Sequence, residues 1–275
     1  MTLRHLLKDK LNKEELAAVP SSFDIIGSKE KAVAIIELPD SLLEKKKIIA
    51  EALMKNHRNV KSVLLKASAR SGIYRTREFA LIAGDSNTEV KHKESGCIFL
   101  LDPKQVYFSP RESTERMRIA EKVKKSETVM VFFAGVGTFA IVIAKKAKPK
   151  NIIAIEINPV AVDYIFKNAK VNKVDIHVLL GDVLEKAKEF YGKCDRVLMP
   201  LPEKAYDYLE EAIKCTKKKG TIHMYFFSPE SEMKKWEKKV KNKLQQMKKR
   251  CSVSTHKVLP YGPHIWKYRM DIKIL

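Results

Sequence analysis

Three short stretches carry residues whose types and spacing suit a nucleoside ligand. "VMVFFAGVGTF" (129–139) runs from an apolar segment through a glycine turn into a predicted helix. Glycine there lets the backbone approach a ligand, and the start of the helix supplies N–H donors. Glu156 ends the next apolar run, where a carboxylate can accept hydrogen bonds from both hydroxyls of a ribose. Asp182 follows the third run, where a second carboxylate can meet an adenine amino group.

Each feature alone has an ordinary alternative: a turn glycine, a helix N-cap or a solvated acid. Together they follow three consecutive strands, and ligands of open α/β sheets bind at the carboxyl ends of the strands. The turn "GVGT" lacks the GxGxxG fingerprint of dinucleotide sites, so an adenosyl ligand without a pyrophosphate fits it better. The pattern therefore favours S-adenosylmethionine as the cofactor.

The order of predicted elements divides the chain in two. From Ser126 apolar strands alternate with helices, which is typical of an α/β domain whose parallel sheet is covered on both faces. One of these helices, at 204–220, is expected to end at Gly220. Before the α/β domain, short β-like runs surround one clear helix at 41–56. The predicted layout is an N-terminal helical extension (1–21), a small α+β domain (22–108), a linker helix (109–125) and the α/β domain (126–275).

Composition indicates a folded protein with a basic surface. The 275 residues suit two domains, and 45% of them are hydrophobic, enough for a core. Lys and Arg number 54 against 33 Asp and Glu, a formal net charge of +21. Such an excess attracts polyanions, of which nucleic acid is the commonest large one. The alternative is a Lys-rich surface of the heat-adapted kind.

The four cysteines are far apart in the sequence and form no metal-binding motif, so we expect buried thiols and no metal. The first twenty residues are charged and amphipathic rather than secretory, and no apolar run approaches 18 residues. We therefore expect a cytoplasmic protein without a membrane partner.

Several stretches resemble one enzyme family. "FFAGVGTF", "AIEINPVAV", "DRVLMPLP" and, most specifically, "YFSPRESTERMRIAEKV" resemble the archaeal and eukaryotic tRNA (guanosine-37) N1-methyltransferases, from about Phe23 to the C-terminus. The resemblance implies a class I Rossmann-like methyltransferase domain that binds S-adenosylmethionine. It also implies a small preceding domain that helps to clamp the tRNA anticodon stem-loop. We expect the protein to act as a monomer.

The resemblance also implies roles for individual residues. Arg75 matches an arginine that contacts O6 of the target guanine, and Glu115 matches a carboxylate proposed as general base. The cofactor-binding residues that it implies, together with the glycine turn, are Arg116, Phe133, Gly135, Gly137, Glu156, Ile157, Asp182, Val183 and Pro200.

Two positions depart from the family pattern. Val131 stands where the family usually has an acid, and Pro200 stands where it usually has an asparagine. A sister family shares the architecture and transfers the aminocarboxypropyl group of the same cofactor to a tricyclic wyosine base of tRNA. Three hypotheses remain open: methyl transfer to guanosine-37, with a wyosine intermediate as a further substrate; aminocarboxypropyl transfer; and an inactive RNA-binding module.

The proposed chemistry has a physical basis. N1 of guanine must lose its proton to attack a methyl sulfonium, and a carboxylate can accept that proton. A cation near O6 stabilises the negative charge that moves there. Glu115 and Arg75 supply this pair; their ordinary alternatives are an ion pair of Glu115 with Arg116 or Arg118, and a phosphate contact of Arg75.

A long basic helix is predicted near residues 232–250. Its apolar residues recur at helical spacing and are expected to face the core, whereas its lysines could face either RNA or solvent. The apolar stripe consists of Met233, Trp236, Val240, Leu244 and Met247.

Overall fold

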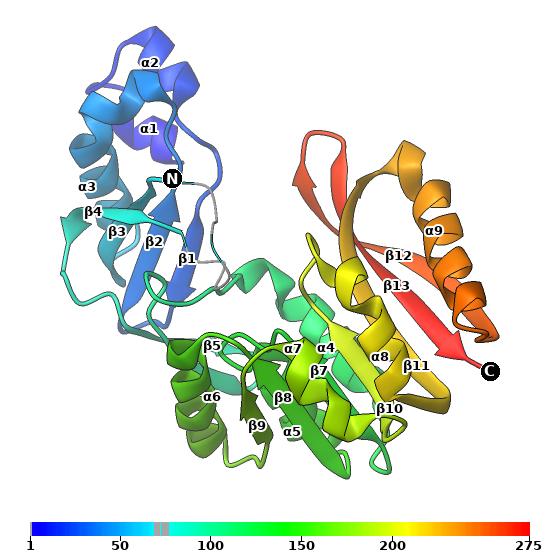
Figure 1. Ribbon diagram of the computed structural model, residues 1–275. Coiled ribbons are helices and arrows are strands. Elements are labelled where there is room, and N and C mark those ends of the chain that lie inside the picture. Colours follow the sequence, from blue (N-terminus) through cyan, green and yellow to red (C-terminus); the bar gives the residue numbers. More distant parts are fainter. Residues whose placement is uncertain (1, 69–71, 73–76) are drawn as a thin grey trace. The chain divides into compact units, whose positions relative to one another are not determined.

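The computed structural model describes residues 2–68, 72 and 77–275, and the chain divides into two compact units, Met1–Pro110 and Arg111–Leu275. Each unit has its own sheet (Figure 1). Each also has its own buried hydrophobic cluster.

The first unit contains a four-stranded sheet in the order β1-β2-β3-β4 and a separate β5-β6 hairpin. β2 and β3 are parallel and are joined through α3, and the other pairs are antiparallel. All five residues of β2 are apolar and buried, as expected of a central strand. The strands are β1 (Asp24–Gly27), β2 (Ala32–Ile36), β3 (Val60–Lys66), β4 (Phe79–Gly84), β5 (Val90–Glu94) and β6 (Cys97–Leu101).

The helices of the first unit are α1 (Leu3–Leu7), α2 (Lys13–Ala18) and α3 (Lys46–Asn56), with a 3-10 turn at Asp40–Lys45 before α3. Asn12 caps α2 and forms a capping box with Glu15, which satisfies backbone donors at the helix start. Leu7 and Val19 are fully buried in the same cluster as β2. The N-terminal helices are therefore part of the packed core of this unit.

The second unit contains a seven-stranded sheet in the order β12-β13-β11-β10-β7-β8-β9. The strands from β11 to β9 are parallel, and β13 is antiparallel to both of its neighbours. The strands are β7 (Thr128–Phe132), β8 (Asn151–Glu156), β9 (His177–Leu180), β10 (Cys194–Met199), β11 (Thr216–Pro229), β12 (Cys251–Gly262) and β13 (Ile265–Ile274).

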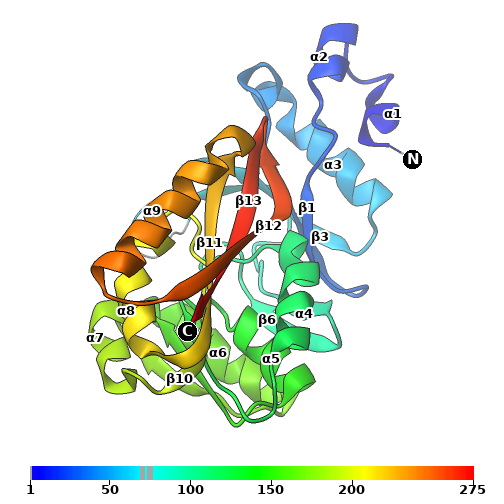
Figure 2. The same ribbon diagram turned by 90° about the vertical axis from the view of Figure 1, so that its right-hand side faces the viewer.

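Helices cover both faces of this sheet. Figure 2 shows α4 and α5 on one side and α7, α8 and α9 on the other. The strands alternate with helices as the sequence predicts, and the α/β Rossmann-like architecture is confirmed. The helices are α4 (Ser113–Lys122), α5 (Thr138–Ala147), α6 (Pro159–Asn172), α7 (Val183–Lys186), α8 (Leu209–Cys215) and α9 (Met233–Gln246), with 3-10 turns at Pro110–Glu112, Ala187–Phe190, Ala205–Tyr208 and Glu230–Glu232.

The predicted end of the helix at 204–220 was wrong. α8 stops at Cys215, and β11 begins at Thr216, which pairs with Cys194 of β10. A Cβ on Gly220 would lie 2.6 Å from Thr216 Cγ2 and 3.0 Å from the Asp195 carbonyl oxygen. Gly220 therefore allows a close approach within the sheet rather than capping a helix.

The apolar stripe of α9 lies where the sequence predicts. Val240 and Leu244 of α9 are fully buried, and the other three residues of the apolar stripe pack against the same cluster, which confirms the core interpretation. The four cysteines are unpaired, and all except Cys251 are buried. None of the described helices is long and apolar enough to span a membrane.

Candidate functional site

The glycine turn follows the end of β7 and starts α5. Phe133, Gly135 and Gly137 all have positive φ angles, of 53°, 57° and 84°. A Cβ on Gly137 would lie 3.0 Å from Ile141 Cδ1 and 3.3 Å from Ile165 Cγ2, so the turn also packs closely on α5 and α6. At Gly137 a residue without a side chain fits this backbone shape at low cost, whereas Phe133 adopts a positive φ despite its side chain.

Glu156 ties the turn to the neighbouring strand. The residue is 8% exposed, and its carboxylate accepts hydrogen bonds from Gly135 N at 2.7 Å, Ile157 N at 3.0 Å and Asn158 N at 2.9 Å. Burial raises the pKa of the Glu156 carboxyl, and the three N–H donors partly offset this. The structure thus brings together Gly135, Glu156 and Ile157, which the sequence singled out separately.

The third strand end lies beside the second. Gly181 N donates to the Glu156 carbonyl oxygen at 2.9 Å, which joins the two loops. Asp182 caps α7, its Oδ1 accepting from Leu184 N at 2.7 Å, and Val183 is buried next to it. Asp182 and Val183 therefore lie at the same edge of the sheet as Glu156, as predicted.

Tyr208, which sequence reasoning missed, packs against the predicted residue Phe133 at this edge. The rings of Phe133 and Tyr208 are 4.8 Å apart and nearly perpendicular. Burial, with Asp182 as the next largest cause, raises the pKa of Tyr208. Tyr208 ends the 3-10 turn Ala205–Tyr208 and caps α8, inside the segment predicted as one helix, so no sequence signal placed it at the sheet edge.

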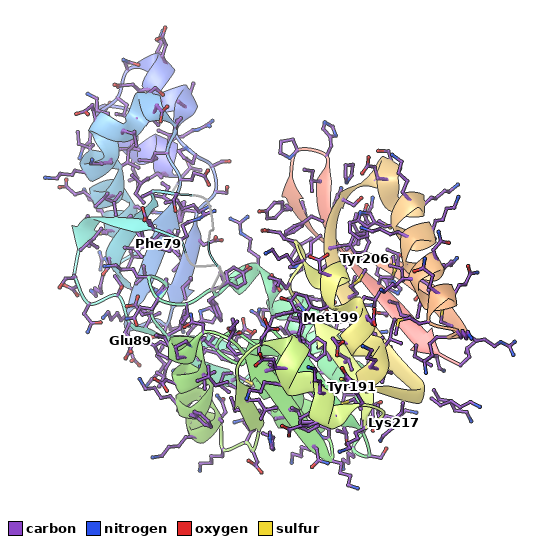
Figure 3. All side chains as sticks on the ribbon, viewed as in Figure 1. Phe79, Glu89, Tyr191, Met199, Tyr206 and Lys217 are labelled. Atoms are coloured by element: carbon purple, nitrogen blue, oxygen red, sulfur yellow. The ribbon has the colours of Figure 1, made fainter. Side chains whose placement is uncertain are left out.

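Pro200 is half-buried directly after β10, whose last residue is Met199 (Figure 3). Val131 is fully buried in β7, between Ala154 and Leu198 of the adjacent strands. A valine at this position leaves no polar group to satisfy.

Glu115 lies on the face of α4 that packs against the sheet, in a buried polar network. Its side chain is 2% exposed and accepts from Tyr225 Oη at 2.8 Å, Arg269 Nη1 at 2.6 Å and Arg118 Nη1 at 3.0 Å. The ion pair of Glu115 with Arg118, which the sequence offered as an alternative to a catalytic role, is therefore present. It belongs to a larger buried cluster. Arg116 beside it is also 2% exposed.

The network continues across three strands. Arg269 also contacts Asp271 at 2.7 Å, and Asp271 accepts from His223 Nδ1 at 2.6 Å. Arg196 donates to His223 Nε2 at 2.6 Å and pairs with Glu127 at 2.8 Å. Because Nε2 accepts from a guanidinium, His223 is neutral with its proton on Nδ1. Three carboxylates and three guanidiniums balance one another in this chain of contacts.

The position of Tyr225 shows where Glu115 lies relative to the sheet edge that carries Glu156 and Asp182. It follows Met224, which pairs with Met199 at the end of β10, so Tyr225 is level with Pro200. Met224 and Phe226 face the cluster under α8 and α9, and Tyr225 faces the opposite side, toward α4. Glu115 is thus held at the carboxyl edge of the sheet. Arg75, the other predicted catalytic residue, lies outside the described residues.

These features fit an adenosyl ligand. A buried carboxylate lies at one strand end, a second carboxylate lies at the next, and a glycine turn and an aromatic pair lie at the same edge. Such groups suit the ribose, the adenine and the flat surface of a nucleoside. The strand order and this edge define the class of S-adenosylmethionine-dependent methyltransferases.

The chain belongs to the TRM5/TYW2 methyltransferase family. Residues 90–255 match the TRM5/TYW2 methyltransferase domain, and residues 3–88 match the TYW2 N-terminal domain. Trm5b of Pyrococcus abyssi, named tRNA (guanine(37)-N(1))-methyltransferase, is 40% identical over 93% of this chain and 76% of its own. Taw22 of Nanoarchaeum equitans, named tRNA (guanine(37)-N(1))/4-demethylwyosine(37)-methyltransferase, is 32% identical over 92% of this chain and 99% of its own.

Solved structures agree with this assignment. The complex of aTrm5 with tRNALeu has a TM-score of 0.84 and 32% identity, covering 100% of this chain and 78% of that one. Pyrococcus horikoshii TYW2 in complex with MeSAdo has a TM-score of 0.82 and 26% identity, covering 99% of this chain and 98% of that one.

Proposed function

We propose that this protein transfers the methyl group of S-adenosylmethionine to N1 of guanosine-37 in the anticodon loop of tRNA. The observation that carries this proposal is the buried Glu115 carboxylate, which Tyr225 and Arg269 orient at the same sheet edge as Glu156 and Asp182. Relatives whose names specify this reaction support it.

The residues at the edge have distinct proposed roles. Glu156 and Ile157 bind the ribose of the cofactor, and Asp182 and Val183 bind its adenine. Phe133, Gly135, Gly137 and Pro200 shape the pocket, and Arg116 contributes a cation. S-adenosylmethionine, when bound, supplies a methyl carbon on a positively charged sulfur.

Glu115 is the proposed general base. It accepts the N1 proton of guanine, so that the N1 electron pair is free to form the new bond to the methyl carbon, while the bond from that carbon to sulfur breaks and leaves its electron pair on sulfur. Arg269 and Tyr225 limit the rotation of the carboxylate, so that its orientation is set before the base arrives. Arg75 is the proposed cation at O6, where the negative charge develops.

Aminocarboxypropyl transfer is the second candidate, because residues 3–88 match the TYW2 N-terminal domain. A third candidate reaction is methylation of 4-demethylwyosine, which the name of the Nanoarchaeum relative includes.

One experiment distinguishes these candidates. The enzyme is incubated with S-adenosylmethionine and either an unmodified tRNA transcript or a tRNA that carries 4-demethylwyosine at position 37, and the nucleosides are analysed by mass spectrometry. We expect N1-methylguanosine from the transcript. A product with the aminocarboxypropyl mass, formed only from the second tRNA, would overturn the proposal. No product from either tRNA, with cofactor binding also absent, would favour an inactive RNA-binding module.

A further inference from the structure

β11, β13 and β12 extend past the edge at which the cofactor residues lie. β10 pairs with β11 only as far as Met199 and Met224, whereas β11 and β13 stay paired to Pro229 and Ile265. At about 3.3 Å per residue, the five further residues project roughly 16 Å beyond the sheet edge. Figure 1 shows this ribbon as the gold and red strands that continue above α8.

Two aromatic side chains stack on this ribbon. The rings of Phe227 and Tyr261 have centroids 3.8 Å apart and an interplanar angle of 27°. Tyr261 is 54% exposed, so Phe227 covers one part of its ring while much of the rest is open to solvent. An aromatic residue that is this exposed and already stacked on one side offers a flat apolar surface at a fixed place.

The aromatic pair lies on the face of the ribbon against which Glu115 of α4 packs. Phe227 is two residues beyond Tyr225 on the same strand, and residues two apart on a strand share a face. Tyr225 donates to the Glu115 carboxylate. Phe227 is therefore displaced outward from Tyr225, the partner of the proposed general base, by roughly 7 Å along the strand.

A basic cavity lies level with Tyr225 rather than with the aromatic pair, because Arg269 in its lining pairs with Tyr225. It has a volume of about 660 Å³ and lies between α4 and β12, with Glu121 as a carboxylate in its wall. Its cationic lining residues are Arg118, Lys122, His256, Lys257 and Arg269. Lys122, His256 and Lys257 are exposed. Arg118 and Arg269 contact Glu115, and Lys257 pairs with Glu230, whereas the exposed Lys122 on α4 suits a phosphate. A cation and a stacking surface on the same side of the sheet are the combination with which proteins hold single-stranded nucleic acid.

We propose that the stacked pair of Phe227 and Tyr261 receives a nucleobase of the anticodon loop adjacent to the target guanine. This inference rests on the proposed tRNA methyltransferase function. The target base must leave its stack to reach Glu115, and its neighbour then has an exposed face that an aromatic ring can cover. Every base has such a face, so the contact stabilises the open loop without selecting its sequence.

The test measures binding of an unmodified tRNA transcript to the full chain across a series of salt concentrations. We expect Tyr261→Ala to weaken binding by roughly 5- to 150-fold, the range for loss of one base–aromatic stack. Tyr261→Trp should restore wild-type affinity, because it keeps a stacking surface. The slope of log K against log salt should not change in either variant, since no phosphate contact is lost.

Two control variants separate stacking from charge and from exposure. Lys122→Ala should reduce the salt slope by about one, as expected for one phosphate contact. Phe166 of α6 is 55% exposed, so Phe166→Ala should leave tRNA affinity unchanged. Thermal melting and calorimetry with S-adenosylmethionine should give wild-type values for Tyr261→Trp.

The proposal is overturned if Tyr261→Ala binds tRNA as tightly as Phe166→Ala, or if its salt slope falls as that of Lys122→Ala does. Failure of the underlying function gives a different result, because the wild-type enzyme then forms no methylated guanosine whatever its tRNA affinity.

Discussion

At the scale of single residues, Glu156 connects the cofactor site to the backbone that forms it. Its carboxylate holds Gly135, Ile157 and Asn158, which belong to two loops. Substitution removes the proposed ribose contact and also leaves three buried N–H groups without their acceptor.

We expect Glu156→Ala to weaken S-adenosylmethionine binding by at least about tenfold, because one charge-assisted hydrogen bond is worth about 1.5 kcal/mol or more. Isothermal titration calorimetry measures this, and a lower melting temperature should accompany it. Glu185 is exposed on α7 nearby, and Glu185→Ala serves as the matched control. Unchanged affinity in Glu156→Ala would remove the ribose assignment.

Glu115 is the residue on which the proposed chemistry depends. Glu115→Gln should lower the single-turnover methylation rate by roughly 10²–10⁴-fold, the usual contribution of a general base. Cofactor affinity should stay near the wild-type value. Raising the pH should partly restore the rate, since hydroxide then competes for the N1 proton.

Tyr225→Phe provides the comparison for Glu115. It keeps the carboxylate and its two guanidinium partners and removes one hydrogen bond, so its rate should fall by about tenfold or less. If Glu115→Gln methylates as fast as Tyr225→Phe, the general base is another residue and Glu115 is a structural ion pair.

At the scale of elements, the buried network fastens α4 to the strands. Arg269 of β13 connects Glu115 on the helix to Asp271 and, through it, to His223 of β11. Removing one partner of such a network leaves a buried charge uncompensated, which makes the network costly to interrupt. The helix that carries the proposed base is therefore held by its polar contacts as well as by apolar packing.

This network gives a prediction for pH. Burial lowers the pKa of His223 below its ordinary value of 6.5, although Asp271 acts in the opposite direction. Between the folded and unfolded pKa values the unfolded chain binds a proton that the folded protein does not. Stability should therefore fall as pH drops below about 6.5, by at most about 1.4 kcal/mol per pH unit.

Denaturant unfolding of the wild type and of His223→Gln between pH 7.5 and 5 tests this prediction. The variant should show the smaller loss of stability on acidification. Glu156, whose raised pKa has the opposite effect from about pH 4.5 upward, is present in both proteins and cancels in the comparison. Parallel curves for the two proteins would mean that His223 does not titrate on unfolding.

At the scale of the whole molecule, the net charge of +21 should govern tRNA affinity. Each phosphate that a lysine or arginine neutralises contributes a slope of about −0.7 to −0.9 in log K against log salt. We expect a slope equivalent to several phosphates when tRNA binding is measured from low to physiological potassium chloride. A flat response would assign the positive charge to another purpose, such as the surface of a heat-adapted protein.

The order of strands and helices and the residues at the strand ends could be predicted from the sequence alone. Gly135, Glu156 and Asp182 each follow an apolar run, and parallel strands place their carboxyl ends at one edge. The order of the elements along the chain was sufficient to predict this site, because successive parallel strands place their carboxyl ends next to one another.

Only the tertiary structure decided what surrounds Glu115. Tyr225 and Arg269 lie 110 and 154 residues away from it, and no periodicity connects side chains on strands that distant. The end of α8 at Cys215 also depended on strand pairing, because Thr216 pairs with Cys194 although the lysines after it suit a helix. Helix propensity is a local quantity, whereas the pairing that overrides it and the ion pairs that bury Glu115 form between segments that meet only when the sheet assembles.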